Sequence, residues 1–143
     1  MEIKQFTATK AFIKYNGKIL ILRESGKYED GTNMGYYDIP GGRVKPGQRF
    51  DESLRREIKE ETGLNIAIGE PFFVSEWRPE KNGEQWQIVG IFFECQADID
   101  RVILSNDHDK YEWIDPKEYI KFKLIDNLKP AFKSYNQRQT VNQ

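Results

Sequence analysis

Three glutamates near the end of a helix-like segment are the residues best suited to chemistry in this chain. Glu57, Glu60 and Glu61 follow a stretch that starts with Gly41-Gly42, and a further glycine comes two residues after them. Carboxylates this close together repel one another unless a cation lies among them. Oxygen ligands of this kind suit hard divalent cations such as Mg2+. The spacing therefore indicates a candidate metal site, and the alternative is a solvated acidic helix end with ordinary salt bridges.

Helical periodicity predicts where these carboxylates lie relative to the core. The segment from about Arg49 to Thr62 is predicted to be a helix, with Gly63 as its left-handed cap. An apolar stripe runs along it through Phe50, Leu54 and Ile58. At about 100° per residue, Glu61 falls inside this stripe and Glu57 falls at its edge. A core-facing carboxylate is costly without a partner, which favours the metal site over the solvated helix end.

The paired glycines before the helix can bring the backbone close to a ligand because they carry no side chain. A carbonyl of Gly41 or Gly42 could then face a metal, and Gly42 is the candidate ligand. The glycines could equally serve a tight bend, and both roles are compatible.

Residues 42–64 resemble the signature of the Nudix hydrolases, Gly-x5-Glu-x7-Arg-Glu-U-x-Glu-Glu-x-Gly-U, in which U is a bulky apolar residue. We call this segment the box. Its fixed positions here are Gly42, Gln48, Arg56, Glu57, Ile58, Glu60, Glu61, Gly63 and Leu64. One position departs from the pattern, because Gln48 stands where the family has Glu. The preceding Tyr37-Asp38-Ile39-Pro40 is typical of MutT-like members.

The resemblance implies an α/β (α+β) fold, an α/β/α sandwich around a mixed β-sheet. It also implies hydrolysis of a nucleoside diphosphate linked to another moiety, with Mg2+ or Mn2+ as cofactor. In this reading Glu60 and Glu61 are metal ligands, and Glu57 is a ligand or orients the attacking water. Arg56 holds Glu57 in place. Gln48 is expected to weaken metal binding without abolishing it.

Other candidate site residues lie outside the box. Family members often draw one more carboxylate from a later strand or loop, and Glu112 is the candidate here, with a surface carboxylate as the alternative. His108 has no partner histidine, which argues against a histidine-based zinc site and leaves a surface residue or a mobile catalytic group. The candidate substrate-binding residues are Arg23, Tyr37, Arg43 and Arg78.

Composition predicts one domain over residues 1–143, with a polar tail from about residue 136. A net charge of −1 provides no basic surface for a nucleic-acid polymer. The single cysteine, Cys95, excludes an internal disulfide framework and fits a reducing compartment. No apolar run reaches membrane-spanning length, and the first residues lack the apolar core of a signal peptide. We therefore expect a cytoplasmic protein that does not associate with membranes.

The predicted elements mix strands and helices irregularly, which argues against a doubly wound fold. A hairpin is expected from residues 6–15 and 18–23 around Asn16-Gly17, which suits a type I′ turn. Further strands are expected at residues 66–68, 71–77, 85–97 and 112–114, with a loop at 98–110. A last helix carries Ile125, Leu128 and Phe132 on one face, and Pro130 interrupts it unless it lies in the first turn.

These observations favour a MutT-like enzyme that converts a normal or modified nucleoside triphosphate to the monophosphate and pyrophosphate. Hydrolysis of ADP-ribose or a nucleotide sugar is the first alternative, because Pro79 stands about where ADP-ribose-specific relatives carry a proline. A non-catalytic ligand-binding regulator is the second, although such modules usually lose box carboxylates that are present here. The expected partner is a small nucleotide, and the sequence leaves open whether the chain is a monomer or a homodimer.

Overall fold

The computed structural model describes residues 2–27 and 33–141 of the chain. Its elements, in chain order, are β1 (Ile3–Tyr15), β2 (Lys18–Glu24), β3 (Tyr37–Asp38), β4 (Gly41–Arg43), α1 (Phe50–Thr62), β5 (Ile66–Trp77), β6 (Glu80–Lys81), β7 (Glu84–Ala97), β8 (His108–Ile114), the 3₁₀ helix η1 (Pro116–Lys121) and α2 (Leu128–Val141).

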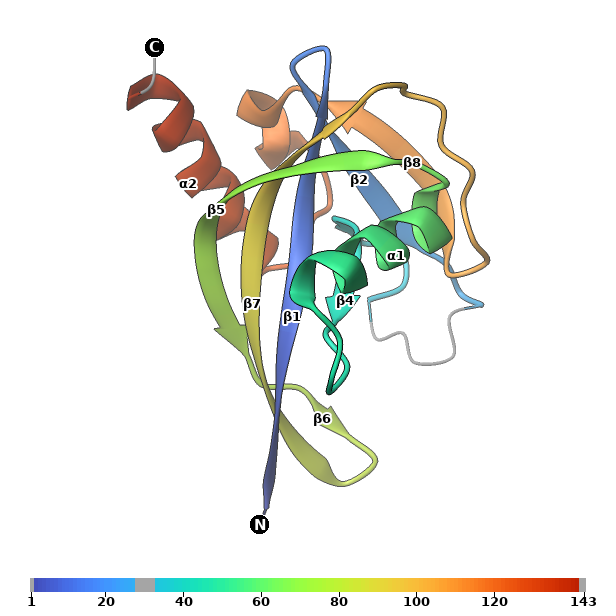
Figure 1. Cartoon of the computed structure of the whole chain (residues 1–143), viewed down its shortest axis with the longest axis vertical. Coiled ribbons are helices and arrows are strands. Elements are labelled where there is room, and N and C mark those ends of the chain that lie inside the picture. The colour runs from blue at the N-terminus through green and yellow to red at the C-terminus, as the bar shows by residue number, and fades with distance from the viewer. Residues whose placement is uncertain (1, 28–32, 142–143) are drawn as a thin grey trace.

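The strands form one mixed sheet around the long strand β1 (Figure 1). Its main path runs β3-β2-β1-β7-β5. Off this path, β4 pairs with β1, β6 pairs with β7 and β8 pairs with β2. β1 and β7 pair in parallel along almost their whole length, from Ile3 with Gln85 to Lys14 with Gln96. The other pairs are antiparallel, including the predicted hairpin of β1 and β2, whose turn residues Asn16 and Gly17 both have positive φ. β1 therefore holds the other strands in register.

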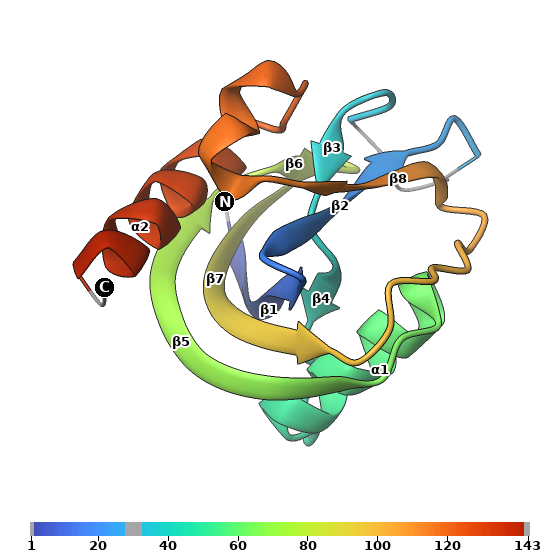
Figure 2. The ribbon, with the colours of Figure 1, turned by 90° about the horizontal axis from the view of Figure 1, so that it is seen from above.

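The sheet has a buried face on each side, and a helix covers each of them (Figure 2). Side chains alternate along the strands, so neighbouring residues enter different cores. In β1, Phe12 faces the core below α2, whereas Ala11 and Ile13 face the core below α1. In β2 all four residues from Ile19 to Leu22 are fully buried, as their continuous apolar run predicts. This arrangement confirms the expected mixed α+β fold with helices on both sides of the sheet.

α1 begins and ends close to where periodicity predicts. Leu54 and Ile58 are completely buried against the sheet. The helix ends at Gly63, whose φ of 74° is left-handed and whose N–H donates to the carbonyl of Lys59. At the other end Arg49 occupies the N-cap, and its side chain forms no capping hydrogen bond. Packing against the sheet therefore stabilises this helix more than its N-terminal cap does.

Several predictions about element boundaries were wrong. The two strands expected at residues 66–68 and 71–77 are one strand, β5, whose pairing with β7 shifts register around Pro71. The expected loop 98–110 ends earlier, because β8 begins at His108. The polar segment from about residue 136 is part of α2, which continues to Val141 and has Pro130 in its first turn, where a proline is tolerated. Phe50, expected in the apolar stripe of the helix, is 46% exposed, because it is the first residue of α1. Its ring nevertheless stacks on that of Phe93.

Among the described residues, no helix combines the length and apolar character needed to cross a lipid bilayer.

We predict that Ile58→Ala lowers the free energy of unfolding by about 2–5 kcal/mol, because it leaves a cavity between α1 and the sheet. Urea denaturation measures the change. The exposed Arg55 on the same helix provides the control, since Arg55→Ala should leave stability nearly unchanged. An equal, small effect of both substitutions would contradict the packing described for α1.

Candidate active site

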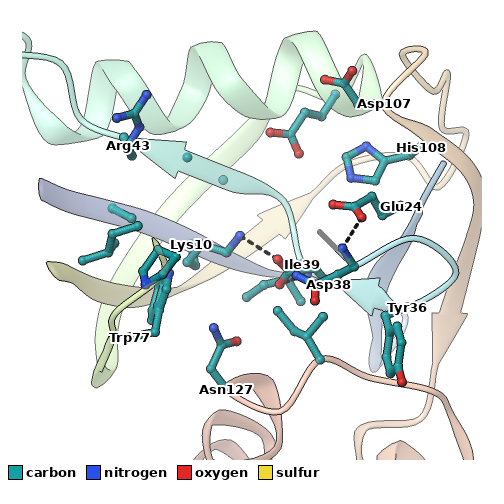
Figure 3. Close-up of a pocket in the computed structure, with 18 of the residues that line it drawn as sticks. Lys10, Glu24, Tyr36, Asp38, Ile39, Arg43, Trp77, Asp107, His108 and Asn127 are labelled. Atoms are coloured by element: carbon teal, nitrogen blue, oxygen red, sulfur yellow. Dashed lines mark hydrogen bonds and ion pairs between the residues drawn. The ribbon is translucent and has the colours of Figure 1, made fainter. Parts of the chain in front are cut away.

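Two neighbouring cavities contain most of the residues that the sequence singles out. The first, which we call the sheet pocket, has a volume of about 340 Å³ and lies over β1 and β7. Trp77, Trp86 and Tyr36 contribute aromatic surface to it, and Lys10, Asp38, Glu24 and His108 contribute polar groups. Figure 3 shows Trp77 at one end of this pocket and His108, Asp107 and Glu24 at the other. It therefore has an aromatic end and an acidic end.

The second cavity, which we call the helix pocket, lies between the glycine loop and the end of α1. Its lining includes the three box carboxylates, Glu57, Glu60 and Glu61, and the side chain of Ser105. The residues that line both pockets are Gly41, Gly42, Arg43, Glu61 and Asp107. The two cavities thus meet at the glycine loop, so one elongated ligand could occupy both.

Glu61 lies where the pockets meet and is partly buried. Burial is the main reason that its pKa is raised from 4.5 to about 8, and the nearby negative charge of Glu57 adds to this. The positive charge of Lys10 and a hydrogen bond from the backbone N–H of Gly41 act in the opposite direction, without offsetting the burial. A divalent cation would supply the missing positive charge.

Arg56 holds the other two box carboxylates. Its guanidinium Nη2 lies 3.1 Å from Oε1 of Glu57, and its Nε lies 3.6 Å from Oε1 of Glu60. In the described part of the chain, no three side chains of His, Cys, Asp or Glu converge closely enough to hold a metal as they stand. The donor set nevertheless fits a hard cation, because three carboxylates and backbone carbonyls line one pocket. Glu57 and Glu60 would have to turn from Arg56 towards Glu61.

The two glycines are required by different contacts. At Gly41, φ is 144°, and a Cβ would come within 2.1 Å of the carbonyl oxygen of Thr9. At Gly42, a Cβ would lie 3.0 Å from the carboxylate carbon of Glu57. β4 pairs with β1 here, Gly41 with Lys10 and Gly42 with Thr9. The glycines therefore allow the loop to approach both β1 and the box carboxylates.

Arg43 follows the two glycines and lines both pockets. Its guanidinium carbon is 4.5 Å from the ring centre of Phe6 and 4.7 Å from that of Trp86. It forms no ion pair with any residue in the ranges that the structure describes. Two aromatic rings thus orient a positive charge that remains available for an anionic ligand.

The structure does not bring four other predicted residues into either pocket. Arg23 donates from Nε to Asp109 at 2.7 Å, and Arg78 donates from Nε to Glu76 at 2.9 Å, both in exposed pairs. Tyr37 is buried, and its hydroxyl donates to Glu112. Burial and this hydrogen bond raise the pKa of Tyr37 to about 12. Glu112 is therefore held beside Tyr37 on β8, away from the box carboxylates.

Sequence reasoning missed the polar residues that lie across from the box. Nζ of Lys10 is 3.2 Å from Oδ2 of Asp38, and both side chains line the sheet pocket (Figure 3). Lys10 alternates with Ala8 and Phe12 on β1, and a lysine on a buried strand face signals a partner. Asp107 falls within the loop predicted at residues 98–110, and it lines both pockets.

Comparison with known proteins agrees with this geometry. The NUDIX domain family model matches residues 5–135. The nucleoside triphosphatase NudI of Escherichia coli K12 is 28% identical over 129 residues, which cover 85% of this chain and 90% of the relative. The crystal structure of the MutT protein from Methanosarcina mazei Go1 superposes with a TM-score of 0.83 at 26% identity and covers 97% of this chain and 98% of that one.

A more distant structure shows the same fold. The solution structure of the Escherichia coli ORF135 protein has a TM-score of 0.72 at 20% identity and covers 97% of this chain and 94% of that one. The family match spans most of the chain and includes the glycine loop, α1 and its three carboxylates. This chain therefore belongs to the Nudix family and is a hydrolase of pyrophosphate bonds.

Proposed function

We propose that this Nudix hydrolase converts a nucleoside triphosphate to the nucleoside monophosphate and pyrophosphate in the cytoplasm, with Mg2+ or Mn2+ as cofactor. The observation that carries the proposal is the junction of the two pockets at Gly41–Arg43. A flat base suits the aromatic end of the sheet pocket, and a phosphate chain suits the side next to the box carboxylates. The name of the NudI relative supports the same substrate class.

The ion would be held by Glu57, Glu60, Glu61 and the carbonyl of Gly42. The raised pKa of Glu61 and the acidic lining of the helix pocket support this assignment, because phosphates do not bind beside three carboxylates without added positive charge. When bound, the ion would polarise the phosphoryl oxygens and acidify a water molecule. Arg56 keeps Glu57 and Glu60 close to the site until the ion binds.

Arg43 binds the phosphate chain in this proposal. Its guanidinium already lies between Phe6 and Trp86, so little side-chain entropy is lost when it donates to a phosphate oxygen. Trp77 and Trp86 lie along the same pocket and offer ring faces for stacking on a base. These residues bind and orient the substrate, whereas the box carboxylates face its phosphates.

One observation favours the ADP-ribose or nucleotide-sugar alternative. Pro79 lines the sheet pocket beside Trp77, on the wall where a second sugar could lie. The regulator alternative is less favoured, because Glu57, Glu60 and Glu61 are all present and line one pocket.

A panel of nucleoside triphosphates, ADP-ribose and nucleotide sugars, assayed with and without Mg2+, distinguishes the three functions. Products separated by ion-exchange chromatography should be nucleoside monophosphate and pyrophosphate, formed only with the metal. Preferential release of ribose phosphate from ADP-ribose would favour the first alternative. Ligand binding without turnover of any compound would favour the regulator.

Glu61→Gln should lower kcat by about a hundredfold or more, because it removes a charged ligand of the ion. Mn2+ affinity, measured by calorimetry without substrate, should fall in parallel. Glu52→Gln, an exposed change on the same helix, serves as the control and should alter neither quantity. Normal turnover or unchanged Mn2+ affinity in Glu61→Gln would refute the metal assignment.

The stability of the metal-free protein should fall as the pH rises from about 4.5 to about 8. The ordinary pKa of 4.5 applies to Glu61 in the unfolded chain, whereas its pKa in the folded protein is about 8. Between these two values the folded state therefore keeps a proton that the unfolded state has lost. Glu61→Gln cannot titrate and should therefore gain stability relative to wild type over the same window. Urea denaturation in EDTA at both ends of this pH window measures the free energy of unfolding of the two proteins. A difference in stability between them that does not change with pH would contradict the raised pKa of Glu61.

Arg43→Ala should raise KM for the triphosphate by about 10- to 100-fold, the effect expected for losing a hydrogen bond between charged groups. Steady-state kinetics at saturating Mg2+ give KM separately from kcat. Arg55→Ala is the matched control, because Arg55 is an exposed arginine of α1 that lines neither pocket. If both variants keep the wild-type KM, Arg43 does not bind the phosphate chain.

A further inference from the structure

The segment from Ser105 to His108 carries two buried polar atoms that have no hydrogen-bond partner in the described structure. They are Oγ of Ser105, a residue that lines the helix pocket, and Nδ1 of His108, a residue that lines the sheet pocket. The other buried atoms of this kind, on Thr9 and Ser53, line neither pocket. Both atoms are enclosed by protein, so the imidazole can meet the pocket only through its other nitrogen, Nε2, which is not buried and has no hydrogen-bond partner among the described residues.

This segment is held firmly rather than as a mobile loop. The backbone N–H of Ser25 donates to the carbonyl of Asp107 at 2.8 Å, and the Ser25 hydroxyl donates to the carbonyl of Asn106 at 2.6 Å. Directly after it the pairing of β2 with β8 shifts register, because Arg23 pairs with Lys110 but Glu24 pairs with His108. β8 thus has one extra residue, Asp109, whose carboxylate bonds to Arg23. A bulge of this kind re-aims side chains beside it.

His108 lies at the acidic end of the sheet pocket, next to the junction with the helix pocket. Asp107, its neighbour, lines both cavities. Figure 3 shows the imidazole between Asp107 and Glu24, well away from Trp77. A nucleotide whose base lies near Trp77 would therefore extend its phosphate chain towards His108.

The charges around His108 are mixed, and its ring is partly buried. Burial is the main influence and lowers its pKa, with Lys10 acting in the same direction. The carboxylates of Asp38, Asp107 and Asp109 act in the opposite direction. The imidazole is consequently neutral at neutral pH and has a nitrogen that can accept a proton.

We propose that His108 is a catalytic residue that accepts the proton of the attacking water. This role rests on the proposed function, since it requires a phosphate chain at the junction of the pockets. The water O–H bond breaks and its proton passes to Nε2, while the oxygen bonds to phosphorus. The bond from phosphorus to the bridging oxygen breaks, and pyrophosphate and the monophosphate separate. The proton then passes from the imidazolium to solvent.

Neither Glu112 nor the box carboxylates fit this role as well. Glu112 accepts a hydrogen bond from Tyr37 and lines neither pocket. Glu57, Glu60 and Glu61 are assigned to the ion under the proposed function, which lowers their basicity. His108 is a titratable residue of the sheet pocket, and its Nε2 is neither buried nor hydrogen-bonded in the described structure.

The test uses two variants, His108→Gln and His108→Ala, with Lys110→Gln as a neighbouring control, because Lys110 is exposed on β8 and lines neither pocket. Both His108 variants should lose about 10²- to 10⁴-fold in kcat, the contribution of a general base, while KM stays within about threefold. Mn2+ affinity and the melting temperature should match wild type. Added imidazole should raise the kcat of His108→Ala by about tenfold or more, because it can occupy the space left by the missing ring and accept the proton. The amide of His108→Gln fills that place, so imidazole should not restore it.

Three results would overturn the proposal: kcat within about threefold of wild type in both His108 variants, a loss confined to KM or to Mn2+ affinity, or a loss in His108→Ala that imidazole does not restore. The wild-type panel assay is read first. Absence of triphosphate hydrolysis there refutes the proposed function, whereas normal hydrolysis retained by both variants refutes the role of His108 alone.

Discussion

The site depends on one constraint, the partly buried carboxylate of Glu61 beside the glycine loop. Burial disfavours its charge, and among the described residues the compensation comes from the N–H of Gly41 and the ammonium group of Lys10. Helical spacing fixes it there, because Ile58, three residues earlier on α1, is completely buried against the sheet. The protein thus uses the packing of a helix to place a carboxylate where it is stable only with added positive charge or a proton. A divalent cation satisfies this constraint and makes the neighbouring acidic pocket suitable for phosphates.

The sheet brings the remaining groups to that carboxylate. β1 pairs with β4 on one side and with β7 on the other over the same residues, Ala8 to Lys10. β1 therefore separates the glycine loop from β7, which carries Trp86, and β5, which carries Trp77, is the next strand beyond β7. Gly90 completes this arrangement, because a Cβ there would come within 2.5 Å of the Trp77 ring. One strand thus connects the aromatic end of the sheet pocket with the box carboxylates.

Local sequence patterns predicted α1, the hairpin and the long strand β7, because each has a clear period and a glycine or turn signal at its end. They also predicted that Glu61 is drawn into the apolar face of the helix. The patterns failed where long-range pairing decides the outcome. Glu112 was predicted as the additional carboxylate of the site, but its partner, Tyr37, comes from a distant strand. His108 was assigned to a loop, and only the pairing of β8 with β2 and the two hydrogen bonds from Ser25 place it in a pocket wall.

The most direct test is a crystal structure of the protein with Mn2+ and a non-hydrolysable nucleoside triphosphate, measured with anomalous scattering at the manganese edge. The account predicts an anomalous peak in the helix pocket, with Glu61 and at least one of Glu57 and Glu60 turned from Arg56 to coordinate it. A manganese ion bound elsewhere, with Glu61 still paired only with the backbone of Gly41, would contradict it.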